Sequence, residues 1–384
     1  MSPRHSHYDM IFLGGGCAAL SLLVRLLDTT QFSHFRFLVI DPSEKKSNDR
    51  TWCFWERGEG YFESLVYKQW AQLNFYGPAT SIDLDMSGYR YKMIRGLDFY
   101  RYCMDRLEQS GRVEWIREAV TSVQSHSDHF RINGQALTAA VVFNSIYRPT
   151  PARVDLLQHF KGWTIETQSP VFDSARATLM DFTVSQQAGT TFVYVMPYDE
   201  RRALVEYTLF TRQLLSEADY EAGLRQYISA QLGIGDRYRV TEEEFGVIPM
   251  TTRRFRFFEE GVFNLGMAGG QTKASSGYTF QFIQKQSQQL VALLSAQPAD
   301  NWAGALHHYQ PDPARFHFYD RVLLNVIDGG YLSGQQVFTR LFERNPAHAI
   351  FQFLDNETDL MQELRIISSL PVFPFMRAAI KSIQ

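Results

Sequence analysis

Two short apolar runs near the amino terminus have the length and the flanks of buried parallel strands. Residues 8–13 form the first run and residues 35–40 form the second. Between them, Leu20, Leu23 and Leu27 recur at the spacing of one helix face. The pattern therefore predicts a strand, a helix and a second strand, which is the beginning of an α/β domain with a parallel sheet.

The predicted turn between the first strand and the helix carries glycines at a spacing suited to a dinucleotide. Gly14, Gly15 and Gly16 are followed by Ala19, which gives the pattern G-x-G-x-x-A. Gly14 permits a tight turn, Gly16 lets the backbone approach a pyrophosphate, and Ala19 lets helix and strand pack closely. Asp41 ends the second strand, where a carboxylate would bind ribose hydroxyls. We therefore predict dinucleotide binding, the alternative being that Asp41 only ends a strand in a turn.

A second region has the residue pattern of two strands joined by a polar turn, which is typical of a β-hairpin. Residues 191–197 and 203–210 are the predicted strands, and residues 198–202 form a polar turn. One face of the second strand is wholly apolar and is expected to pack on a helix, for example residues 220–232. Its members are Ala203, Val205, Tyr207 and Leu209. The opposite face places Glu206 between apolar neighbours.

Glu206 has two possible environments in this hairpin. Between Leu204 and Phe210 in a cavity, poor solvation would raise the pKa of its carboxyl, as a proton donor near neutral pH requires. On an exposed strand it would instead pair with Arg201 or Arg202. The alternation alone leaves both environments open.

Composition and charge narrow the class of function. The 384 residues are 45% hydrophobic, enough for a sizeable core. The formal charge of -3 provides no strong field for a polyanion such as nucleic acid. Three distant cysteines and ten scattered histidines predict neither disulfides nor a metal site, and they fit a reducing compartment. No apolar stretch reaches the roughly 18 residues of a spanning helix.

Three further segments accompany the glycine motif in a familiar order. They are residues 49–55, residues 196–208 and residues 266–280. With these four motifs, and over the chain from residue 8 to its end, the sequence resembles the lycopene cyclase family, in its bacterial lycopene beta-cyclase branch.

The resemblance implies a mixed α/β fold of the glutathione-reductase-like class. A Rossmann-type FAD-binding domain would comprise residues 1–154 and 251–300. An antiparallel-sheet substrate domain, residues 155–250, would be inserted into it. A helical carboxyl-terminal region, residues 301–384, would follow.

The resemblance also implies a reaction. The family closes the linear ends of lycopene into beta-ionone rings, by way of gamma-carotene to beta-carotene, without net redox change but with reduced FAD. NADPH is the expected reductant. An acidic residue in a Phe-Leu-Glu-Glu-Thr-like strand is essential in the family. Here only its second glutamate is kept, as Glu206, with Val205 in the first position.

Aromatic side chains would stabilise the cationic intermediates of such a reaction. The candidates are Tyr194, Tyr198, Phe210 and Tyr278. Two rival functions stay open beside the cyclase. One is a redox flavoenzyme, such as a prenyl-lipid reductase or a hydroxylase, and the other is a non-enzymatic isoprenoid-binding escort protein.

Other cofactor contacts are less sharply indicated. Many flavoproteins carry Gly-Asp in the late glycine segment, whereas this chain has Gly266 followed by methionine. Backbone amides around Gly269 and Gly270 could still contact the flavin, since small residues let the main chain approach. Arg95 opens a predicted helix and would lie near the flavin diphosphate or in solvent.

Lycopene is a bilayer hydrocarbon, so we expect a cytoplasmic protein that associates peripherally with the inner membrane. Residues 370–376 are apolar and interrupted by proline, and Arg377 and Lys381 follow. Such a segment suits an interfacial anchor, with an internally docked tail as the alternative.

Overall fold

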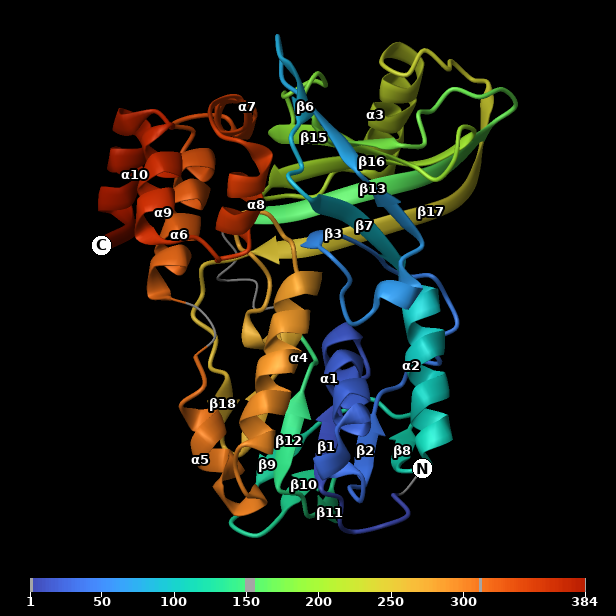
Figure 1. Ribbon diagram of the computed structural model, residues 1–384, viewed down its shortest axis with the longest axis vertical. Coiled ribbons are helices and arrows are strands. Elements are labelled where there is room, and N and C mark those ends of the chain that lie inside the picture. The colour runs from blue at the N-terminus through green and yellow to red at the C-terminus, as the bar shows by residue number, and fades with distance from the viewer. Residues whose placement is uncertain (1–2, 149–155, 311–312, 384) are drawn as a thin grey trace.

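Two large sheets organise the chain, and a group of carboxyl-terminal helices packs beside the second (Figure 1). The computed structural model describes residues 3–148, 156–310 and 313–383. The predicted boundary between residues 154 and 155 lies outside the described residues. The mixed α/β class and the Rossmann-type parallel sheet are confirmed.

The first sheet has the strand order β18-β19-β12-β1-β2-β8. All neighbouring strands are parallel except the edge pair β18 and β19. The strands are β1 (Met10–Leu13), β2 (Phe37–Ile40), β8 (Val113–Ile116), β12 (Val141–Asn144), β18 (Phe258–Glu259) and β19 (Val262–Asn264). Helices α1 (Cys17–Asp28), α2 (Gly96–Ser110) and α4 (Phe280–Ser295) contribute to the core on one face.

The second sheet has the order β17-β13-β16-β15-β14-β5-β6. Its strands are β5 (Gln72–Tyr76), β6 (Ser81–Leu84), β13 (Leu156–Thr167), β14 (Arg176–Asp181), β15 (Thr190–Pro197), β16 (Arg202–Thr211) and β17 (Tyr238–Met250). The predicted hairpin is β15 and β16. Strands β5 and β6 come from the range assigned by sequence to the FAD-binding domain, and the division into domains stays a prediction.

The two faces of the second sheet carry different cores. Helix α3 (Glu217–Ala230) packs on the face that holds Val205 and Tyr207, as the alternation predicts. The other face packs with a three-stranded sheet of order β3-β7-β4 and with carboxyl-terminal helices. That small sheet consists of β3 (Thr51–Arg57), β7 (Tyr89–Arg95) and β4 (Lys68–Trp70). Glu206 therefore faces the interior between layers.

Short elements complete this part of the fold. A second small sheet contains β9 (Val123–Ser125), β10 (Phe130–Ile132) and β11 (Gln135–Leu137). The 3-10 helices η1 (Thr30–Phe32), η2 (Glu63–Leu65) and η5 (Ala299–Asn301) lie in connections.

The carboxyl-terminal region is helical, as predicted. Its helices are α5 (Trp302–His307), α6 (Ala314–Asp328), α7 (Gly334–Arg344), α8 (Ala347–Leu354), α9 (Leu360–Ser368) and α10 (Val372–Ile383). The break predicted in residues 370–376 is confirmed at Pro371, which lies between α9 and α10, and is wrong at Pro374. Pro374 lies in the first turn of α10, where its missing N–H costs no helical hydrogen bond. Among the residues that the structure describes, no helix has both the length and the apolar character to cross a bilayer.

Candidate active site

A cavity of about 540 Å³ connects the glycine turn of the first sheet with the hairpin of the second. Gly16, Cys17 and Ala18 line it on one side, and Tyr194 and Glu206 line it on the other. Its volume lies in the usual range for small-molecule sites. The structure thus brings the predicted nucleotide motif and the predicted acid to one cavity.

The glycine turn has the conformation that its motif predicts. Gly14 has a φ of +86°, and a β-carbon there would lie 2.6 Å from Oγ of Ser145. Gly16, the N-cap of α1, would have no heavy atom within 4 Å of an added β-carbon. Ala19 is buried, which lets α1 pack closely. The first backbone amides of α1 have no partner within the helix, and the residues that carry them line the cavity, as an anion site requires.

Asp41 lies at the end of β2 beside this turn. Its carboxylate accepts hydrogen bonds from the backbone N–H of Gly15, at 2.7 Å, and of Ser43, at 2.8 Å. Lys45 adds an ion pair at 3.3 Å. These contacts fix the turn and hold an acidic group where a ribose hydroxyl would approach.

The late glycine segment reaches the same region from β19. Gly266 begins the 3-10 helix η4 (Gly266–Gly269) with a φ of +53°, and a β-carbon there would lie 2.6 Å from Cβ of Ala18. This close approach packs η4 against α1. Gly269 and Gly270 line a neighbouring cavity of about 650 Å³, and Met267 lines both cavities.

Arg95 and Arg50 have different surroundings. Arg95 is the N-cap residue of α2, and its guanidinium pairs with Asp98 at 2.9 Å and lies over the ring of Tyr67. Arg50 lines the cavity instead. The expected contact of Arg95 with a diphosphate stays a prediction.

Glu206 is buried in the middle of β16. Only 8% of its surface is exposed, and Thr208 donates a hydrogen bond to its Oε1 at 2.9 Å. Burial, and next the charge of Glu244, raise the pKa of Glu206 well above its usual value. Its surroundings therefore favour the protonated, uncharged form of this side chain.

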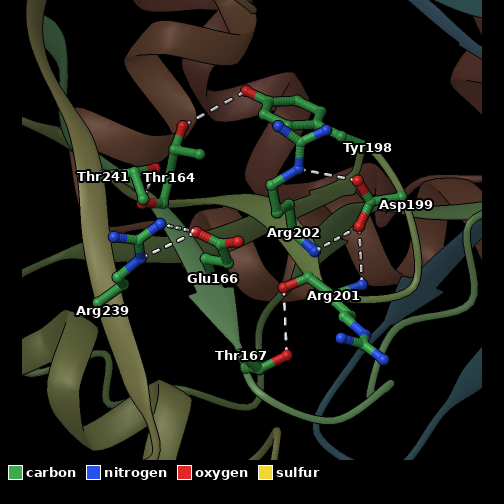
Figure 2. Close-up of polar contacts among 9 residues, drawn as sticks. All are labelled: Thr164, Glu166, Thr167, Tyr198, Asp199, Arg201, Arg202, Arg239 and Thr241. Carbon is green, nitrogen blue, oxygen red and sulfur yellow. Dashed lines mark hydrogen bonds and ion pairs between the residues drawn. The ribbon is translucent and has the colours of Figure 1, made fainter.

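The polar turn of the hairpin explains why Glu206 has no arginine partner there. Figure 2 shows Asp199 accepting hydrogen bonds from the backbone of both Arg201 and Arg202 and pairing with the Arg202 guanidinium at 2.8 Å. Because Glu206 is buried and Asp199 holds both arginines within the turn, the alternative of an exposed Glu206 paired with Arg201 or Arg202 is wrong.

Glu244 on β17 is the residue that the sequence analysis missed. Gly162 of β13 is the register partner of both Glu206 and Glu244, so the two glutamates flank one glycine. Thr51 donates a hydrogen bond to Oε2 of Glu244 at 2.8 Å. Burial raises the pKa of Glu244, and the hydrogen bonds from Thr51 and Glu206 oppose that rise. The site therefore holds two hydrogen-bonded carboxyls.

Aromatic side chains line the cavity next to this pair. Tyr194 is the register partner of Glu206 on β15, and Tyr278 and Tyr91 lie nearby with their hydroxyls 3.3 Å apart. Burial raises the pKa of all three tyrosines well above the usual value. They therefore stay neutral phenols, which present π faces but no nucleophilic phenolate.

The other two aromatic candidates lie elsewhere. Tyr198 makes a long hydrogen bond to Thr164, 3.5 Å, in the hairpin turn (Figure 2). Phe210 packs in the core against Phe192 and Phe338. Tyr194 and Tyr278 are thus the two predicted aromatics that line the cavity.

These features define what the site can do. A flavin dinucleotide fits the residues present, because the open space at Gly16, the free amides of α1 and Asp41 match a diphosphate and a ribose. In the described ranges, no group of three or more His, Cys, Asp and Glu side chains is arranged to hold a metal ion. The buried carboxyls and the aromatic rings that line the cavity suit acid chemistry on an apolar molecule.

Comparison with known proteins identifies the family to which the chain is similar. The family model "Lycopene cyclase protein" matches residues 9–380. The lycopene beta-cyclase of Pantoea ananas is 27% identical over 393 aligned positions, covering 97% of each chain. That of a Paracoccus species is 28% identical over 225 positions, covering 56% of this chain and 57% of its own.

Solved structures share the fold at lower identity. A geranylgeranyl bacteriochlorophyll reductase-like protein from Thermoplasma acidophilum superposes with a TM-score of 0.64 at 11% identity, covering 98% of this chain and 99% of its own. A probable FAD-dependent monooxygenase from Pseudomonas aeruginosa gives 0.60 at 18% identity, with 88% and 100% covered.

Proposed function

Because this chain belongs to the lycopene cyclase family, we propose that it closes the ends of linear lycopene into beta-ionone rings by proton-initiated cyclisation. The observation that carries the proposal is the buried carboxyl of Glu206, which lines a cavity that begins at the glycine turn and whose surroundings favour its protonated form. An alkene is a weak base, so its protonation needs an acid that is protonated at neutral pH and shielded from water.

FAD is the proposed cofactor, with NADPH as its reductant. Gly14, Gly15 and Gly16 with the amides of α1 would hold the diphosphate, Asp41 would contact the ribose, and Ala19 would allow close packing. Gly266 lets η4 pack closely against α1. Gly269, Gly270 and Arg95 are proposed to contact the cofactor at the edge of its site. When bound in its reduced form, FAD would supply electron density that stabilises a neighbouring positive charge.

The chain's own residues perform the steps of the cyclisation. Glu206 donates its proton to the terminal double bond, which leaves a tertiary carbocation. The next double bond attacks that carbon and closes a six-membered ring. Loss of one ring proton restores an alkene, so the product is an isomer of the substrate and no electron is consumed.

The carbocation must be stabilised without being trapped. The π faces of Tyr194 and Tyr278 attract a cation through the ring quadrupole. Their raised pKa values keep the hydroxyls protonated, so no phenolate competes as a nucleophile. The low exposure of Glu206 also limits water, whose attack would give an alcohol in place of a ring.

The substitution Glu206→Gln tests this function. Glutamine keeps the shape and the hydrogen bonds but has no acidic proton, so ring formation should fall by about 10²- to 10⁴-fold while FAD binding persists. Glu200→Gln, in the exposed turn of the same hairpin, is the matched control and should keep the wild-type rate. Product analysis by chromatography measures both. A Glu206→Gln enzyme that retains most of its activity would contradict the assignment.

We also propose that the outer face of α9 and α10 binds the membrane surface peripherally on the cytoplasmic side of the inner membrane. Large apolar side chains are exposed along both helices. They are Leu360, Met361, Leu364, Val372, Phe373, Met376 and Ile380. Exposed apolar faces with nearby Arg377 and Lys381 suit an interface with anionic lipid. Because lycopene resides in the bilayer, the enzyme needs such a surface to reach its substrate.

Vesicle flotation tests this membrane contact. Phe373 is 83% exposed, so Phe373→Asp should weaken binding to anionic liposomes without affecting folding. Leu214→Asp is the control, because Leu214 is also exposed but lies in the loop before α3. If both variants float with the liposomes to the same extent as the wild type, the proposal that this face binds the membrane is wrong.

A further inference from the structure

Glu244 and Glu206 form a carboxyl pair built across three strands. Their register partner Gly162 lies on the strand between them, so their backbones are two strand spacings apart, about 9 to 10 Å. Side chains that far apart meet only if each leans toward the other over the middle strand. The missing side chain of Gly162 leaves the room for this.

The position of the Glu244 side chain supports that geometry. A β-carbon on Gly162 would lie 2.9 Å from Cγ of Glu244 and 3.1 Å from its Oε1. The Glu244 carboxyl therefore lies directly over Gly162, on the side of Glu206. The two carboxyls are close enough to share a hydrogen bond.

Each carboxyl also has one threonine partner. Thr208 donates to Oε1 of Glu206 at 2.9 Å, and Thr51 donates to Oε2 of Glu244 at 2.8 Å. Thr51 begins β3, which comes from a different sheet. The pair is thus anchored from both ends, and both members line the same cavity.

The proposed cyclisation needs both an acid and a base in each turnover, and Glu206 is the acid. We propose that Glu244 is the base: it removes the ring proton from the cyclised carbocation and returns it to Glu206 through their shared hydrogen bond. This inference rests on the proposed function.

The proton balance closes within the pair. Glu206 gives one proton to the substrate and becomes a carboxylate, while Glu244 is already a carboxylate. The C–H bond next to the cationic carbon breaks, its electrons form the new double bond, and its proton passes to Glu244. Transfer from Glu244 to Glu206 restores the resting state without any external acid, base or electron carrier.

A pH profile separates this role from a merely structural one. The active pair carries one proton, so the rate falls at low pH, when both are protonated, and at high pH, when both are ionised. Glu244→Gln should remove the low-pH decline, since glutamine does not titrate. The charged and titratable groups around the pair are Arg50, Cys53, Tyr91, Tyr194, Glu242 and Tyr278.

The experiment compares Glu244→Gln with Glu243→Gln in the FAD-loaded enzyme. Glu243 lies on the same strand, is exposed and pairs with Lys161 on the α3 side of the sheet, so its variant should keep the rate and both limbs of the profile. Glu244→Gln should lose at least about 10²-fold in rate. The double variant with Glu206→Gln should be no slower than Glu206→Gln alone, because the two residues act as a unit. A Glu244→Gln enzyme with the wild-type rate and an intact low-pH decline would overturn the proposal.

Infrared spectroscopy of the enzyme without substrate tests the shared proton independently of turnover. Burial also raises the pKa of Asp355 to about 7, so the C=O band of Glu206 is identified near neutral pH as the band lost in Glu206→Gln, and this band should shift in Glu244→Gln. An unshifted band in Glu244→Gln would refute the shared proton even if the chain cyclises lycopene. If the wild type failed to cyclise lycopene, the proposed function and the base role of Glu244 would both be wrong. The infrared band would still show whether Glu206 and Glu244 share a proton.

Discussion

The substitution Gly162→Ala separates the carboxyl pair without removing either acid. The new β-carbon would lie 2.9 Å from Cγ of Glu244 and 3.0 Å from Cδ1 of Leu204. Ordinary carbon contacts are about 3.5 to 4.0 Å, so these neighbours must retreat by about 0.5 to 1 Å. The Glu244 side chain is flexible and moves more easily than the packed Leu204.

The expected effects on rate and stability differ in size. A displacement of about 1 Å in a catalytic group can cost about 10²-fold, so we expect a 10- to 100-fold slower cyclisation. Crowding costs about 1 to 3 kcal/mol, and replacing glycine within a strand recovers about 0.5 to 1 kcal/mol. The net loss of about 0 to 2.5 kcal/mol is small against a typical unfolding free energy of about 5 to 15 kcal/mol.

The assay measures initial rates of the FAD-loaded enzyme and urea unfolding of the same preparation. Gly304→Ala on α5 is the matched control, since its β-carbon would meet only Oδ1 of Asn301, at 3.2 Å. In a Glu206→Gln background, Gly162→Ala should add no further loss. A folded Gly162→Ala enzyme with the wild-type rate and pH profile would refute the pair as the proton-handling unit.

The remaining predictions concern the cofactor turn and two buried titratable groups. Gly16→Leu should abolish FAD binding, measured by flavin fluorescence, because the side chain would occupy the open space at the start of α1; normal retention of flavin would contradict the nucleotide site. The raised pKa of Glu206 means that the native state loses stability as pH rises above about 4.5, by about 1.4 kcal/mol per pH unit up to the native pKa. Glu206→Gln should therefore be more stable than the wild type at pH 8, and this advantage should shrink at pH 5 in urea unfolding. Burial lowers the pKa of His159 to about 4, so the native state should lose up to about 3 kcal/mol as pH falls from 6.5 to 4, and His159→Gln should remove that loss.

Local sequence patterns predicted the parts of the fold that depend on residues close together in the sequence. The turn at Gly14 and Gly16 needs only its own backbone, and the alternation along β16 separates the Val205 face from the Glu206 face. The nucleotide turn and the strand face that holds Glu206 follow from spacing, whereas the choice of Glu206 as the acid depended on the resemblance to the family.

Glu244 could not be found in the same way. It ends the run Thr241, Glu242, Glu243 and Glu244, which is typical of a solvated strand, and its two acidic predecessors are indeed exposed. Its burial depends on pairing β17 with β13 and on the absence of a side chain at Gly162. Those contacts join residues about 80 positions apart, which no local pattern records.

In the carboxyl-terminal helices, the local pattern predicted one break too many. Pro371 lies between α9 and α10, but Pro374 lies in the first turn of α10, where a proline is compatible with the helix. Arg95 is likewise part of a local i,i+3 ion pair with Asp98, a contact that a motif at a helix start does not reveal.

The stoichiometry of the reductant tests the non-redox cyclisation most directly. Purified enzyme with FAD is incubated anaerobically with lycopene in liposomes and a limiting amount of NADPH, and rings formed are counted against NADPH oxidised. Proton-initiated cyclisation consumes no hydride, so many rings should form for each NADPH oxidised. One NADPH oxidised per product molecule would contradict cyclisation and identify the chain as a reductase.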